Sequence, residues 1–175
     1  AGASRKVYYN ENVYRHNRKS DEYRQINQVG IEVIGEVSLQ TEVDVVMLAL
    51  ASLSEIGKGK LELSHSGLIA AILDLFPDHC RGKVFNRLKN KNFSELAQLA
   101  EKGGVSPQRT QQLMALMKLS GDFYRELPKA LATAAGWPEA TAALQSLAEG
   151  AQVLKQQQLP ENVQLLFDLS TVNDT

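Results

Sequence analysis

The sequence predicts an α+β fold, with antiparallel strands at the start, a block of helices in the middle and a strand that returns at the end. Two runs near the N-terminus are rich in Tyr, Val and Ile, which favour strands. From Leu39 apolar residues recur every three or four positions, as in helices, and from Asn162 to Val172 they alternate again. With 175 residues, 43% of them hydrophobic and 22% charged, the chain can bury a sizeable core.

The first predicted element is a long β-hairpin. The runs Val7–Tyr14 and Gln25–Ile34 have the composition of two strands. The polar stretch between them, residues 16–22, is predicted to be a charged hairpin loop.

A helix and then a strand–helix pair are predicted next. Apolar residues at helical spacing continue from Leu39 until Gly57, and Ser38 stands where an N-terminal cap belongs. Residues 60–65 alternate between apolar and polar, which is typical of a strand. Residues 68–76 form an apolar run that predicts a further helix.

Beyond Pro77 the pattern is helical and strand signals disappear. Nearly every segment from Arg81 to Gln158 has helical period and helix punctuation. Three parts are therefore expected: a core that carries the hairpin (1–77), an all-helical insertion (78–160) and a returning core strand (161–175). The insertion would separate two strands of one sheet.

Charge and cysteine content limit the classes of function. Nineteen Lys and Arg against twenty Asp and Glu give a net charge of -1, so no broad basic surface is available for nucleic acid. The single cysteine, Cys80, has no partner for an internal disulfide and no zinc-ligand spacing around it. No stretch approaches the roughly 20 apolar residues of a membrane span. A cytoplasmic protein without a metal, a membrane anchor or a nucleic-acid partner is expected.

The most informative stretch runs from Val7 to Glu36 and reads VYYNENVYRHNRKSDEYRQINQVGIEVIGE. It resembles motif 2 of the class II aminoacyl-tRNA synthetases in its histidyl-specific form, which implies two strands of an antiparallel sheet packed with helices. In that family the first strand carries an arginine that holds the nucleotide α-phosphate. A guanidinium suits phosphate or carboxylate oxygens because its donors form a planar fork. Arg15 stands at the place of this arginine.

Part of the family's nucleotide site is replaced. Where the family has a glutamate that reads adenine, an aromatic residue that stacks on it and a histidine, this chain has Asn17, Ile26 and Asn27. Ile26 offers no stacking face and Asn17 no negative charge, so two means of binding ATP are missing together. The resemblance thus argues against adenylation.

The amino-acid contacts, by contrast, are kept. Gln28, Gly30 and Glu32 match the family's Gln-x-Gly-x-Glu signature, in which the glutamine and the glutamate contact the amino acid. Residues two apart on a strand project to the same face, so these three lie together. The resemblance implies a histidine site formed by Arg15, Gln28 and Glu32.

The chain's end departs from the synthetases a second time. They follow this strand with an Arg-Gly pair near the reacting groups, whereas Asn173 and Asp174 occupy those places here. The run from Phe167 to Asn173 is similar to the regulatory paralogue, the histidyl-tRNA-synthetase-like regulatory subunit of ATP phosphoribosyltransferase. Motifs 1 and 3 are not found, so the chain is expected to be a fragment.

This resemblance implies regulation rather than catalysis. It predicts no catalytic residue and no cofactor, a partner in the catalytic subunit of ATP phosphoribosyltransferase, and histidine as the feedback effector of histidine biosynthesis. A homodimer within a hetero-oligomer is expected. Two alternatives stay open: an active histidyl-tRNA synthetase, and a synthetase-like domain that senses tRNA.

Ordinary structural interpretations of the same residues also stay open. Arg15, Gln28 and Glu32 could form a hydrogen-bonded cluster on a sheet face without a ligand. His65 and His79 are interpreted as structural or surface residues. Apolar residues such as Met117 and Trp137 are predicted to lie in the core unless the fold exposes them.

Overall fold

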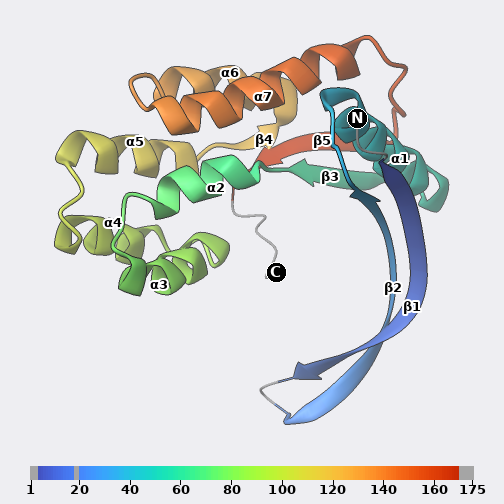
Figure 1. The fold of residues 1–175 in the computed structure, drawn as a ribbon, viewed down its shortest axis with the longest axis horizontal. Coiled ribbons are helices and arrows are strands. Elements are labelled where there is room, and N and C mark those ends of the chain that lie inside the picture. The colour runs from blue at the N-terminus through green and yellow to red at the C-terminus, as the bar shows by residue number, and fades with distance from the viewer. Residues whose placement is uncertain (1–3, 18–19, 170–175) are drawn as a thin grey trace. The chain divides into compact units, whose positions relative to one another are not determined.

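The computed structural model describes residues 4–17 and 20–169 (Figure 1). Packing divides the chain into two units, Ala1–Val46 and Met47–Thr175, and the division falls within the first helix. Each unit is described by itself below. The division into residues 1–77, 78–160 and 161–175 stays a prediction.

The first unit contains the predicted hairpin. Strands β1 (Arg5–Asn17) and β2 (Glu22–Ile34) pair in antiparallel fashion from Arg5↔Ile34 to Asn17↔Glu22. The hairpin is thereby confirmed, but the loop is shorter than predicted. Polar residues on both sides of the turn continue the ladder because backbone hydrogen bonds, rather than apolar side chains, hold that end.

The helix α1 (Leu39–Ile56) begins and ends where the sequence predicts. The Ser38 hydroxyl accepts a hydrogen bond from the Thr41 N–H at 3.2 Å, as an N-terminal cap does. Gly57 follows the helix with φ of 137°, a conformation that side chains with a Cβ rarely adopt. The helix therefore stops at this glycine.

The second unit is built on a three-stranded sheet in the order β3-β5-β4. Its strands are β3 (Gly59–Leu63), β4 (Ser120–Asp122) and β5 (Val163–Asp168). The strand after the helices does return beside β3, as expected, with Gly59 opposite Val163 and Leu63 opposite Phe167. The sheet is mixed, however, because β3 and β5 run parallel while β4 and β5 run antiparallel. The prediction of an antiparallel sheet was wrong for this pair, since a long helical crossover allows a parallel return.

Six helices accompany this sheet within the described residues: α2 (Ser66–Leu73), α3 (Asp78–Lys89), α4 (Phe93–Lys102), α5 (Pro107–Met117), α6 (Phe123–Thr133) and α7 (Pro138–Lys155). The predicted block from 78 to 160 is helical except for β4, so its description as all-helical was wrong at residues 120–122. Three residues are too few for a period-2 pattern to reveal a strand.

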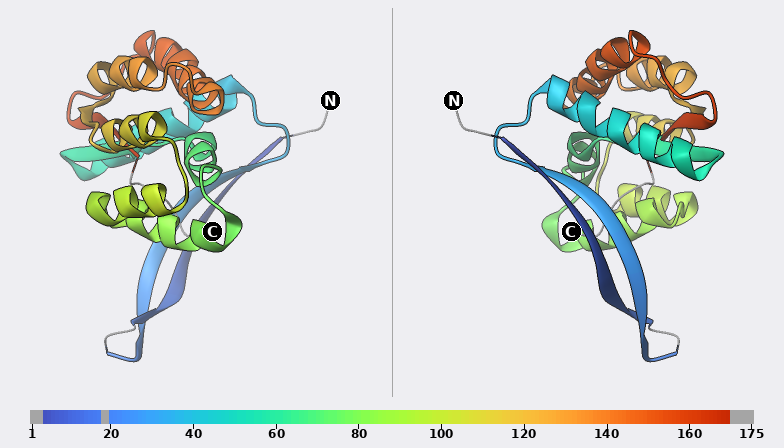
Figure 2. Two further views of the ribbon diagram at one scale, coloured as in Figure 1. Left: turned by 90° about the vertical axis from the view of Figure 1, so that its left-hand side faces the viewer. Right: turned by 90° about the vertical axis from the view of Figure 1, so that its right-hand side faces the viewer.

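The core of the second unit lies between one face of the sheet and the helices. Along β5 the alternate residues Val163, Leu165 and Phe167 are buried, and the Phe123 ring of α6 lies 6.5 Å from that of Phe167. Figure 2 shows α6 and α7 side by side, and α2 packs on α7. Trp137 is buried, as predicted. None of the helices among residues 4–17 and 20–169 is long and apolar enough to cross a membrane.

Candidate ligand site on the hairpin

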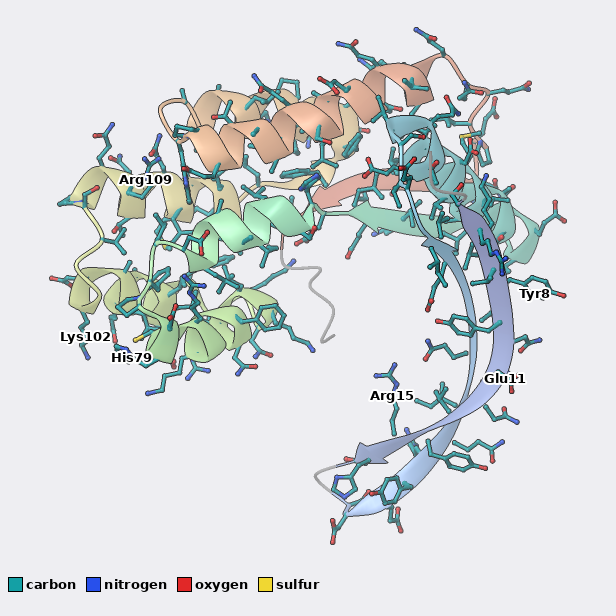
Figure 3. All side chains as sticks on the ribbon, viewed as in Figure 1. Tyr8, Glu11, Arg15, His79, Lys102 and Arg109 are labelled. Atoms are coloured by element: carbon teal, nitrogen blue, oxygen red, sulfur yellow. The ribbon has the colours of Figure 1, made fainter. Side chains whose placement is uncertain are left out.

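The predicted site residues share one face of the hairpin. In an antiparallel ladder, residues directly opposite each other project to the same side. Gln28 lies opposite Glu11, and Glu32 opposite Val7, while Arg15 lies opposite Arg24. Odd positions of β1 and even positions of β2 therefore form one face, which we call the Arg15 face. Figure 3 shows Arg15 and Tyr8 projecting from opposite sides of the ribbon.

A hydrogen-bond network links three residues of this face. A guanidinium nitrogen of Arg15 donates to the Gln28 Oε1 at 3.2 Å, and the Gln28 Nε2 donates to the Tyr9 hydroxyl oxygen at 2.8 Å. Gln28 and Tyr9 are half-buried, whereas Arg15 is exposed. The amide is thus held from both ends, and the guanidinium keeps further N–H donors that a ligand could engage.

Gly30 makes room for the tyrosine. It lies directly opposite Tyr9, and a Cβ at position 30 would stand 2.3 Å from the Tyr9 Cζ. The ring therefore lies across the bare glycine backbone, and a larger residue at position 30 would displace it. Sequence reasoning missed Tyr9, although a glycine inside a predicted strand is a signal of such a close approach.

Glu32 is on the same face but apart from the network. No hydrogen bond or ion pair within the described part of the chain joins Glu32 to Arg15 or Gln28, and Glu32 is exposed. Gly30, with the Tyr9 ring over it, stands between Gln28 and Glu32. The structure thus brings Arg15 and Gln28 together and leaves Glu32 about 13 Å along the strand from Gln28 at the usual rise of about 3.3 Å per residue.

The Arg15 face carries two guanidinium groups side by side, those of Arg15 and Arg24, and also three carboxylates, those of Glu11, Glu22 and Glu32. Arg15 and Arg24 are direct cross-strand neighbours, and like charges in that position repel each other. A carboxylate or a phosphate bound between them would offset this repulsion and accept charge-assisted hydrogen bonds. The Arg15–Arg24 pair, rather than the face as a whole, is therefore suited to bind the anionic end of a small molecule.

The residues that stand in place of the family's nucleotide contacts do not all lie on one face of the hairpin. Ile26 lies on the Arg15 face and is 42% exposed, so a branched aliphatic side chain borders the guanidinium groups there. Asn27 lies on the other face, where its amide donates to the Asn10 Oδ1 at 3.0 Å. Asn17 lies opposite Glu22 in the ladder, at the end of the hairpin. Asn173 and Asp174 are outside the described residues.

His65 caps a helix, and the described histidines and acidic residues form no metal site. Nδ1 of His65 accepts a hydrogen bond from the Gly67 N–H at 3.0 Å and caps α2, which confirms a structural role. Within residues 4–17 and 20–169, no group of three or more His, Cys, Asp or Glu side chains is placed to hold a metal ion.

The chain is similar in sequence to two relatives. The chain is 29% identical over 136 residues to the histidine–tRNA ligase of Methanosarcina acetivorans, covering 77% of this chain and 32% of that protein. It is 29% identical over 133 residues to the ATP phosphoribosyltransferase regulatory subunit of Bordetella pertussis, covering 72% and 34%. The chain thus spans about a third of the length of either relative.

Solved structures share the fold. An ATP phosphoribosyltransferase regulatory subunit/histidyl-tRNA synthetase from Bacillus halodurans superposes with a TM-score of 0.76 at 23% identity, covering 95% of this chain and 43% of that one. A chain of the ATP phosphoribosyl transferase (HisG:HisZ) complex from Thermotoga maritima gives 0.68 at 23% identity, covering 96% and 58%. The expected class II synthetase-like α+β fold is confirmed. The family model described as histidyl-tRNA synthetase matches residues 1–175, and the chain belongs to this family.

Proposed function

We propose that the protein containing this chain is a non-catalytic regulatory subunit of ATP phosphoribosyltransferase, acting in histidine biosynthesis. The observation that carries the proposal is the composition of the Arg15 face. It keeps Arg15 and Gln28 in contact at 3.2 Å but has Ile26 where the resemblance implies a ring that stacks on adenine. An amino-acid site without its nucleotide site suits a sensor, because sensing requires binding but no adenylation.

The ligand in this proposal is histidine. Its carboxylate would accept from the Arg15 guanidinium, and the Gln28 amide would position the guanidinium through the existing hydrogen bond. The Glu32 carboxylate, exposed on the same face but about 13 Å further along the strand, would attract the ammonium group or the imidazole only at long range. Tyr9 joins the site as the residue that fixes Gln28.

Regulation would follow from unequal affinity. Histidine changes the activity of a partner only if it binds one state of the complex more tightly than another. The partner we propose is the catalytic subunit of ATP phosphoribosyltransferase, with the regulatory subunits as a homodimer within a hetero-oligomer. The Bordetella pertussis relative and the Thermotoga maritima complex support this choice of partner. We place the complex in the cytoplasm, because within this chain Cys80 has no second cysteine with which to form a disulfide.

A pair of assays on the full-length protein tests the proposal. One measures histidine-dependent ATP–pyrophosphate exchange, and the other measures activation of a catalytic ATP phosphoribosyltransferase subunit on mixing. We expect activation, inhibition of the mixture by histidine, and no exchange. Robust exchange without activation would overturn the proposal.

Arg15→Gln tests the histidine site within the active mixture. Removing a charge-assisted hydrogen bond costs about 1.5–3 kcal/mol, so the histidine concentration for half-inhibition should rise about tenfold or more. Arg5→Gln is the matched control, because Arg5 is on the same face of the same strand but lies opposite Ile34 at the far end. If histidine inhibits the mixtures containing either variant at the same concentration, Arg15 is not part of the histidine site. The assignment as a regulatory subunit would be unaffected.

A histidyl-tRNA synthetase is the second candidate. The 29% identity to the Methanosarcina acetivorans ligase favours it, and so does the guanidinium at position 15. It would need other residues to replace the adenine contacts at Asn17 and Ile26. The exchange assay separates the two candidates directly.

A further inference from the structure

The helices α3 and α4 enclose a basic groove far along the chain from the Arg15 face. Figure 2 shows the two helices side by side. The groove has a volume of about 210 Å³ and is lined by Lys83, Arg87, Glu95, Gln98, Leu99 and Lys102. We call it the α3–α4 groove.

Helical spacing explains which side chains line it. Lys83 and Arg87 are four residues apart on α3, and the lining positions of α4 are three, four and seven residues apart, so each set forms one stripe. The adjacent stripes Val84/Leu88 and Leu96/Ala100 are fully buried in the seam between the helices. The polar stripes therefore border the same seam from both sides.

The charge of this groove is unbalanced. The Arg87 guanidinium pairs with the Glu95 carboxylate, which is the one acidic group in the lining. Lys83 and Lys102 have no ion-pair partner among residues 4–17 and 20–169. Three cations and one carboxylate leave a local charge of +2, whereas the whole chain carries -1.

Neighbouring basic residues behave differently. Arg81 reaches both Asp74 and Asp78, at 2.9 and 3.2 Å, and Lys91 reaches Asp168 at 2.7 Å. The positive charges of Arg81 and Lys91 are therefore paired with carboxylates of the same fold. Lys83 and Lys102 instead line one cavity from two helices, where an anion that enters would gain from both positive charges.

We propose that the α3–α4 groove binds a small phosphorylated molecule that carries at least two negative charges. The ammonium groups of Lys83 and Lys102 would each donate to phosphate oxygens. Arg87 keeps guanidinium donors besides the Nε that pairs with Glu95. Leu99 offers an apolar surface to the carbon part of the ligand. A volume of about 210 Å³ is enough for a pyrophosphate or a small phosphate monoester.

Calorimetric titration of the whole chain with inorganic pyrophosphate tests this site. In about 0.15 M salt, where charges further apart than about 8 Å are largely screened, we expect binding by the native chain. Lys83→Gln/Lys102→Gln should weaken binding about tenfold or more, since two charge-assisted contacts are lost. The control Lys58→Gln/Lys60→Gln removes the same two charges beside a different cavity and should change affinity by less than about twofold.

Three outcomes would overturn the proposal. The first is that the native chain and Lys83→Gln/Lys102→Gln bind pyrophosphate with equal affinity. The second is that both double variants weaken pyrophosphate binding equally, because the ligand would then be attracted by net charge alone. The third is binding of single-stranded RNA, lost in Lys83→Gln/Lys102→Gln, with no binding of pyrophosphate. Folding of each variant is checked by circular dichroism. The site does not depend on the regulatory function proposed above, so either can fail without the other.

Discussion

An ion pair across the second unit gives the sharpest test of the fold. Lys91, in the turn between α3 and α4, reaches Asp168 at the end of β5, with 2.7 Å between Nζ and Oδ2. The Ser120 hydroxyl of β4 also donates to this carboxylate, at 3.1 Å. Only 8% of the Asp168 side chain is exposed, against 51% for Lys91. The pair therefore fixes the helical turn to a nearly buried carboxylate on the sheet.

Replacing Lys91 with Met removes the ammonium group but keeps most of the apolar stem. Breaking a buried ion pair costs about 3–5 kcal/mol, and losing a charge-assisted hydrogen bond about 1.5–3 kcal/mol. The lower range applies because Lys91 is half exposed and Asp168 keeps other polar contacts. We expect Lys91→Met to lower the free energy of unfolding by about 2 kcal/mol.

Lys91→Gly supplies an internal control. Lys91 has φ of 52°, in the left-handed region, where a residue with a Cβ costs about 1–2 kcal/mol. The glycine variant loses the same ion pair but relieves this strain, so it should be more stable than Lys91→Met by about 1 kcal/mol. Urea denaturation followed by circular dichroism measures both. A loss below about 0.5 kcal/mol in Lys91→Met would refute the role of the ion pair.

Three further predictions concern other parts of the chain. Gly30→Ala should push the Tyr9 ring off the hairpin, because the new Cβ would lie 2.3 Å from Cζ; nuclear Overhauser contacts between that ring and residue 30 should disappear. Ser106→Ala should cost about 1 kcal/mol, or about 2–4 °C in Tm, because its hydroxyl caps α5; thermal melting measures this. Hydrogen bonding from Lys129 lowers the pKa of Glu126, so its contribution to stability is present above the ordinary carboxyl pKa and lost as pH falls through the lowered one. Glu126→Gln should therefore lower stability at neutral pH more than at pH 3, and an equal loss at both would contradict the assignment.

Local patterns predicted the elements well. The helix from Leu39 to Gly57 and the alternation along Val163–Phe167 follow from periods of 3.6 and 2, which each residue and its near neighbours set. The common face of Gln28, Gly30 and Glu32 follows from the same parity rule. These features depend on a few consecutive residues, and so the sequence alone determines them.

Cross-strand register decided the details of the candidate site. That Arg15 reaches Gln28, and that Tyr9 lies over Gly30, depends on which residues of β1 and β2 stand opposite each other. A register shifted by one residue would send every side chain of a strand to the other face relative to its partner. The shared face was predictable, whereas the contacts on it and the isolation of Glu32 were not.

Long-range packing decided the direction in which β3 and β5 pair and which charged residues meet. The parallel pairing of β3 with β5 joins residues about a hundred positions apart, and the pair of Lys91 with Asp168 spans 77. The α3–α4 groove, too, exists only because two helices expose neighbouring basic stripes along one seam. The sequence by itself determined periodicity, strand parity and overall charge, because these are properties of adjacent residues. The tertiary structure alone decided strand direction and which charges meet, because both depend on the path of the chain through space.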